Sequence, residues 1–125
     1  MSQIILNKLD YLRIQKQIQE ALKSKTILEA EAEKLMSELD SAKIVEPQEI
    51  PNDVVTMNSV VKVSFIDSEK QLEFKIVYPE EANFKEKKVS IFSPIATALI
   101  GFRVGDQIEW MVPGGLTKVR IDGIV

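Results

Sequence analysis

The side chains available for chemistry in this chain of 125 residues are limited by two absences. The sequence contains no histidine and no cysteine. Without imidazole and thiol groups, the commonest general base, the commonest transition-metal ligand and the thiolate nucleophile are all missing. Carboxylates, lysines, tyrosines and hydroxyl groups remain. Most enzyme classes are therefore disfavoured, and we expect no catalytic residues, no metal ligands and no cofactor.

Glycine also gives no sign of a cofactor site. The pair Gly114-Gly115 lacks the neighbouring glycines and the lysine of a phosphate-binding loop. It follows Pro113 and stands between two alternating segments, which is typical of a tight hairpin turn. We interpret it as a turn.

Composition and charge describe an ordinary globular protein, with 45% hydrophobic and 28% charged residues. The formal net charge of -3 argues against autonomous nucleic-acid binding, because phosphate contacts need clustered lysine and arginine. The run Lys85, Lys87 and Lys88 is most simply a solvated loop. No segment has the length of a membrane span, and the first residues lack the features of a signal peptide, so we expect a cytoplasmic protein without membrane contact.

The most informative segment begins at Ser93-Pro94 and ends at Gly101. A serine hydroxyl accepts from free amides in the first turn of a helix, and proline at the first helical position loses nothing by lacking an N–H group. Glycine favours the left-handed conformation that ends a helix. The segment therefore predicts one short helix with a cap at each end.

The first 45 residues have helical periodicity. Apolar residues recur at spacings of three and four along two seams, Tyr11, Ile14, Ile18 and Ala21 in the first and Leu28, Ala32, Leu35, Leu39 and Ala42 in the second. Lys23, Ser24 and Lys25 separate the seams, and Thr26 with Glu29 has the spacing of a capping box that restarts the helix. We predict a short antiparallel helical hairpin, a coiled coil whose tip is formed by Lys23, Ser24, Lys25 and Thr26.

Two leucines do not fit this hairpin seam. Leu9 and Leu12 fall outside the first seam, so the base of the first helix has a second apolar side. We expect this side to pack on the following domain, with packing on another subunit as the alternative.

The remainder of the chain changes to a period of two. Pro47 and Pro51 mark a stiff connector, after which alternating segments predict about five strands with the capped helix across them. The expected fold class is α+β, with an antiparallel sheet. The expected division is a helical hairpin over 1–45, a connector over 46–53 and a sheet domain over 54–125.

Residues 50–125 closely resemble the C-terminal domain of the GreA/GreB transcript-cleavage factors. The likeness rests on Ser93–Gly101, on Val104-Gly105-Asp106 and on Pro113-Gly114-Gly115. The segment Pro51–Ser59 points to the short Rnk-type members. The resemblance implies an FKBP-like sheet domain and RNA polymerase as the partner, contacted at the coiled coil of the largest subunit that forms the rim of the secondary channel.

In the Gre factors the contact lies at the start of the capped helix, and this implies polymerase-binding roles for Ser93 and Pro94. Phe92 stands where those factors often have aspartate or asparagine. An exposed Phe92 would supply an apolar anchor, and the alternative is a core residue at a strand end. We favour the anchor, because the alternation of Val89 and Ile91 places Phe92 on the other face.

The hairpin tip of the Gre factors has an acidic pair that helps hold the second Mg²⁺ for RNA cleavage. Here Lys23 and Lys25 stand in its place, and their ammonium groups would repel a metal ion. Glu29 and Glu31 are nearby, but acids in a first helical turn are usually structural. We expect a non-catalytic regulator that competes with Gre-type factors. The alternatives are transcript cleavage through these acids and, from fold analogy alone, prolyl isomerisation.

Overall fold

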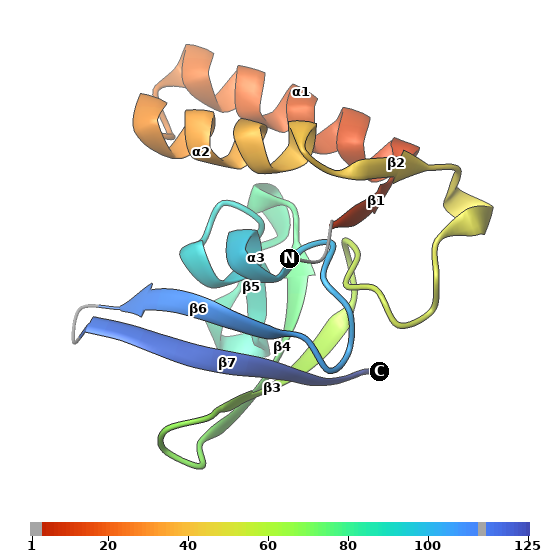
Figure 1. The fold of residues 1–125 in the computed structure, drawn as a ribbon. Coiled ribbons are helices and arrows are strands. Elements are labelled where there is room, and N and C mark those ends of the chain that lie inside the picture. Colours follow the sequence, from red (N-terminus) through yellow and green to blue (C-terminus); the bar gives the residue numbers. More distant parts are fainter. Residues whose placement is uncertain (1–3, 113–114) are drawn as a thin grey trace.

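The computed structural model describes residues 4–112 and 115–125 and places three α-helices and seven strands in them (Figure 1). The helices are α1 (Lys8–Ser24), α2 (Glu29–Asp40) and α3 (Pro94–Leu99). The strands are β1 (Ile5–Asn7), β2 (Lys43–Val45), β3 (Val60–Phe65), β4 (Gln71–Val77), β5 (Lys88–Ser90), β6 (Gln107–Val112) and β7 (Gly115–Ile124). Three short 3₁₀ helices connect them: η1 (Pro47–Glu49), η2 (Pro79–Glu81) and η3 (Phe84–Glu86).

The alternating segments form a five-stranded sheet in the order β5-β4-β3-β7-β6. The predicted strand pairs β3–β4 and β6–β7 are antiparallel, as expected, and so is β3–β7. The expectation of a purely antiparallel sheet is wrong, because β5 pairs with β4 in parallel. The chain crosses from one end of β4 to the start of β5 through η2 and η3, and no local pattern indicates that return. The predicted turn residues Pro113 and Gly114 lie outside the described residues.

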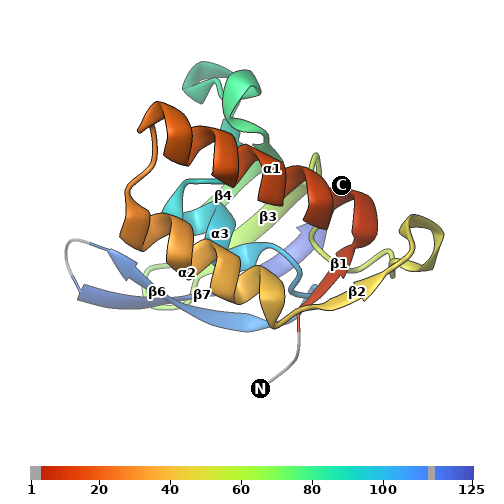
Figure 2. The same cartoon turned by 90° about the horizontal axis from the view of Figure 1, so that it is seen from above.

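The helices α1 and α2 lie side by side above the sheet, with α3 between them and the strands (Figures 1 and 2). One continuous core joins the layers, because residues of both helices belong to the same buried cluster as residues of the sheet and of α3. Ile14, Ile18, Leu35 and Leu39 supply the fully buried side chains of the helix pair. The predicted seams therefore face the rest of the protein as well as each other.

Three details of the helix pair differ from the sequence prediction. The predicted seam residue Leu28 is 69% exposed, because it stands before the first turn of α2 rather than within the helix. It is the N-cap and makes no side-chain capping bond, so the predicted capping box of Thr26 and Glu29 is absent. Leu9 and Leu12 are 65% and 48% exposed, and the expected packing of these leucines on the sheet domain is wrong.

The parallel pair β1–β2 was not predicted. It joins the chain before α1 to the chain after α2, with Leu6 opposite Ile44. The last residues of the region that we predicted as a helical hairpin, Lys43–Val45, thus form a strand instead, which closes the base of the helix pair. Strands of three residues are too short for a period of two to be recognised.

No helix in the described part of the chain is long and apolar enough to cross a membrane.

Candidate functional site

The start of α3 is built as the sequence predicts. The Ser93 hydroxyl accepts from the amide of Ala96 at 3.4 Å, and Pro94 occupies the first helical turn. The Thr97 hydroxyl donates to the carbonyl of Ile91 at 2.9 Å, which ties the helix to the segment that enters it. Pro94 is exposed. The predicted contact residue is therefore accessible on a well-fixed helix start.

Phe92 is partly buried, so it is intermediate between the exposed anchor and the core residue that were the two alternatives. Its amide donates to the Ser90 hydroxyl at 3.0 Å, and its neighbour Ile91 is fully buried. The Phe92 side chain is half-buried and packs against the core. Part of the ring thus stabilises the fold, and the remaining part is open to a partner next to Ser93 and Pro94.

The far end of α3 is held by Gly101 at a φ of +84°. Its amide donates to the carbonyl of Val55 at 2.9 Å, and its carbonyl accepts from the amide of Ile5 at 3.0 Å. A Cβ atom at this position would lie 2.8 Å from the Cβ of Ile4. The predicted cap is displaced, because α3 ends at Leu99 and Ile100 is its C-cap, while Gly101 follows in the left-handed conformation. Gly101 also admits the chain that leads into β1, which the sequence did not reveal.

The four predicted tip residues do come together at the turn between α1 and α2. Lys23 and Ser24 form the last turn of α1, and Lys25 ends it in the left-handed conformation at a φ of 58°. The Thr26 hydroxyl donates to the carbonyl of Ala21 at 3.4 Å and lies 3.1 Å from the Ser24 hydroxyl. All four tip residues are exposed. Two ammonium groups thus stand at the end of the helix pair.

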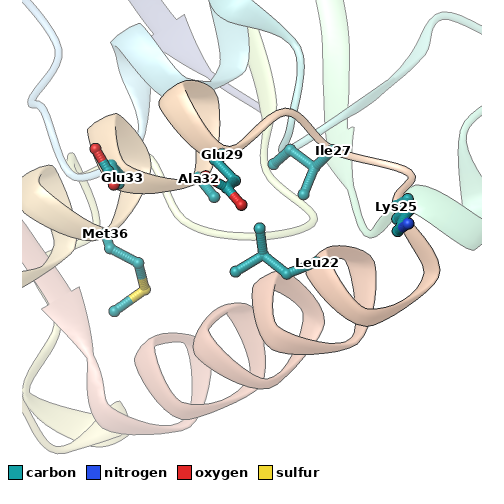
Figure 3. Close-up of a pocket in the computed structure, with 7 residues that line it drawn as sticks. All are labelled: Leu22, Lys25, Ile27, Glu29, Ala32, Glu33 and Met36. Carbon is teal, nitrogen blue, oxygen red and sulfur yellow. The ribbon is translucent and has the colours of Figure 1, made fainter.

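A shallow groove of about 500 Å³ opens between the helices next to this tip (Figure 3). Its apolar lining comes from Leu22, Ile27, Ala32 and Met36, and its charged lining from Lys25, Glu29 and Glu33. The groove was not predicted, because only Ala32 of its apolar lining belongs to a predicted seam, and the other three residues were given no role. It arises where the turn holds the ends of α1 and α2 apart.

The acids considered as metal ligands are on the exposed surface of α2. Glu29 and Glu31 belong to its first turn, where their charges interact favourably with the helix N-terminus. Within residues 4–112 and 115–125, no group of three or more histidine, cysteine or acidic residues is arranged to hold a metal ion.

An unpredicted set of ionisable side chains lies where α1 meets the sheet. Asp10 accepts from the amide of Met57 at 3.2 Å and from the side-chain amide of Asn7 at 3.1 Å. Burial raises the pKa of Asp10 above its usual value, although these bonds and Arg13 oppose the shift. The sequence signal for this site was Asn7 three residues before Asp10, a spacing that is typical of a helix N-terminus.

The guanidinium of Arg13 lies over the ring of Tyr78, 4.1 Å from its centre. Tyr78 is 1% exposed. Burial, reinforced by the nearby carboxylate of Asp10, raises the pKa of its hydroxyl to about 12. These contacts fix the helix pair on the sheet and give no sign of catalysis.

Comparison with known proteins gives consistent results. Residues 50–124 match the family described as "Transcription elongation factor, GreA/GreB, C-term". The chain is 37% identical over 113 residues to "Regulator of nucleoside diphosphate kinase" of Escherichia coli K12, covering 90% of this chain and 81% of that protein. It is 38% identical over 105 residues to "Transcription elongation factor GreA" of Clostridium perfringens SM101, covering 84% of this chain and 66% of that protein.

Among solved structures, the fold is similar to "Prokaryotic transcription elongation factor GreA/GreB from Nitrosomonas europaea". The TM-score is 0.79 at 34% sequence identity, and the match covers 98% of this chain and 99% of that one. The similarity thus includes the helix pair as well as the sheet domain.

Proposed function

Because this chain belongs to the GreA/GreB transcription elongation factor family and is similar to its Rnk-type members, we propose that it binds RNA polymerase at the rim of the secondary channel and regulates transcription there without cleaving the transcript. The observation that carries the proposal is the family match over residues 50–124, which includes the exposed start of α3. In this proposal Phe92, Ser93 and Pro94 contact the coiled coil of the largest subunit.

The proposal assigns different roles to the parts of the chain. Residues 54–125 act as the polymerase-binding domain, with the FKBP-like fold that the family resemblance implies. Residues 1–45 act as a short helical hairpin that points toward the channel, and residues 46–53 connect the two. At a rise of 1.5 Å per residue, the 17 residues of α1 extend only about 25 Å.

Regulation then requires no chemistry in this chain. Two factors that bind one rim exclude each other, so each lowers the apparent affinity of its rival in proportion to its own occupancy. The ammonium groups of Lys23 and Lys25 at the helix turn disfavour a divalent cation, because Mg²⁺ requires oxygen ligands and is repelled by positive charge. A factor of this kind would block the entry of cleavage factors without replacing their activity.

The test is equilibrium binding of the full chain to core RNA polymerase, with GreA as a competitor. We expect the native protein to bind, GreA to displace it, and the double variant Phe92→Ala, Pro94→Ala to bind at least about tenfold more weakly. Ile66→Ala is the matched control. Ile66 is 42% exposed next to the β3–β4 turn, far from α3 (Figure 1). A well-folded native protein that fails to bind polymerase would disprove the proposal.

A further inference from the structure

Phe84 is the most exposed large hydrophobic residue among the side chains that the structure describes. Its side chain is 95% exposed. It begins η3, in the segment that the sequence analysis interpreted as a solvated lysine loop. A phenylalanine in water gains nothing from the fold, since the hydrophobic effect rewards only apolar surface that is removed from water. Its position therefore invites a functional explanation.

The turn that presents Phe84 is firmly held. The Asn83 side-chain oxygen accepts from the amides of Lys85 and Glu86 at 3.1 and 3.3 Å. The backbone of Asn83 exchanges two hydrogen bonds of 3.0 Å with Lys88, and the Lys87 amide donates to the carbonyl of Phe84 at 3.1 Å. The ring is thus displayed on an ordered backbone, and a partner that buries it has little chain entropy to overcome.

One short strand separates this turn from the polymerase-binding residues that we propose. The turn leads directly into β5, which is an edge strand of the five-stranded sheet. Phe92, Ser93 and Pro94 follow at the other end of that strand. Three residues of strand span about 10 Å. A typical protein interface buries about 800 Å² per partner, a patch about 30 Å across. One partner surface can therefore cover both ends of β5.

The charges around Phe84 favour a protein partner over nucleic acid. Glu86 pairs with Lys88 at 3.0 Å, whereas Lys85 and Lys87, both exposed, make no ion pair with any residue in the described part of the chain. Glu80 and Glu81 precede the turn on η2 and would repel a phosphate backbone. An aromatic ring followed in the same turn by two exposed lysines instead complements an apolar pocket bordered by carboxylates.

We propose that Phe84 is a second anchor for RNA polymerase, which inserts its ring into an apolar pocket of the same docking surface while Lys85 and Lys87 face carboxylates at the edge of that pocket. The inference rests on the proposed function and extends it along β5. It makes the docking surface a two-point contact, with one aromatic residue before the strand and one after it.

The experiment measures the affinity of the full chain for core RNA polymerase. Phe84→Ala is expected to weaken binding at least about tenfold, the loss typical of a central aromatic contact. Ile66→Ala, which also removes an exposed apolar side chain, is expected to bind as the native protein does. Because the Phe84 side chain is 95% exposed, its removal should leave the melting temperature unchanged, so misfolding cannot explain a loss.

The charged part of the inference has its own pair of variants. The double reversal Lys85→Glu, Lys87→Glu is expected to slow association several-fold at low salt, with a smaller effect at high salt. Lys70→Glu, a charge reversal in the β3–β4 turn, is the matched control and should leave the association rate unchanged at both low and high salt. A double reversal that leaves association unchanged would overturn the role given to the lysines.

The outcomes separate the two proposals. If Phe84→Ala binds polymerase as tightly as the native protein while Phe92→Ala, Pro94→Ala binds weakly, the anchor at Phe84 is disproved and the proposed function stands. If the native protein does not bind polymerase, both are disproved. Loss of binding in Phe84→Ala but not in Ile66→Ala supports the two-point contact.

Discussion

The amide of Met57 donates a hydrogen bond of 3.2 Å to the carboxylate of Asp10. This contact joins the first turn of α1 to the segment that leads into β3, so it links the helix pair to the sheet domain across 47 positions of sequence. Met57 is nearly buried, and its amide has little access to water. The orientation of the helix pair on the sheet thus depends partly on one carboxylate.

Replacing Asp10 distinguishes its hydrogen bonds from its charge. Asp10→Ala leaves the Met57 amide without this acceptor and should lower the free energy of unfolding by about 1–3 kcal/mol. Asp10→Asn retains an oxygen that accepts both bonds and should cost less. Urea denaturation at pH 7 measures both values, and equal losses in the two variants would contradict the role of the acceptor.

The pH dependence of the same site has a definite sign. Because the pKa of Asp10 is higher in the fold than the ordinary value of 3.8, its contribution to stability is full below 3.8 and decreases as the pH rises through the folded pKa. The native protein should therefore gain stability relative to Asp10→Asn as the pH falls from 7 toward 4. A constant difference between the two proteins over this range would contradict the raised pKa.

Because the Tyr78 hydroxyl is buried, the protein should lose stability at alkaline pH. This hydroxyl has a pKa of about 12 in the fold against 10 in an exposed tyrosine, so its contribution is full below pH 10 and is lost as the pH rises toward 12. In a Tyr11→Phe background the tyrosinate absorbance should appear near pH 12, and Tyr78→Phe should flatten the fall in stability above pH 10. Ionisation near pH 10 without unfolding would refute the burial of this hydroxyl.

A side chain added at Gly101 should destabilise the fold by a steric clash. The same substitution at Gly105 measures the cost of the backbone conformation without such a clash. Gly101→Ala must adopt a φ of +84° and place its Cβ 2.8 Å from that of Ile4, so it should cost about 2–4 kcal/mol. Gly105→Ala has a similar φ of +93° but meets no atom of the described residues within 4 Å, and should cost only about 1–2 kcal/mol. Thermal denaturation compares them, and equal losses would mean that the approach of Ile4 is unimportant.

The proposed absence of cleavage predicts the behaviour of backtracked transcription complexes. Adding the native protein should not accelerate RNA cleavage, and adding it before GreA should reduce the cleavage that GreA causes. Cleavage by the native protein that disappears in Glu29→Lys, Glu31→Lys would instead establish the alternative function. Glu46→Lys, an exposed charge reversal outside the helix pair, is the matched control.

Several elements were predictable because short-range rules specify them. Ser93 and Pro94 define the start of α3 through capping and backbone conformation alone, and the alternation of Val61 and Val63 marks a strand whatever its neighbours are. The family was likewise accessible from the sequence, since the resemblance was carried by local motifs such as Ser93–Gly101. The helical seams predicted most of the buried residues of the helix pair for the same reason.

The tertiary structure decided how these elements meet. The parallel pairs β1–β2 and β4–β5, the acceptor role of Asp10 and the exposure of Leu9 and Leu12 depend on which distant segment lies opposite each residue. The same is true of the groove beside the helix turn and of the exposed position of Phe84 in η3, before β5. Local sequence determines backbone preference and the spacing of apolar side chains. Burial is set by the packing of surfaces far apart in the chain, and it determines which side chains remain available to a partner.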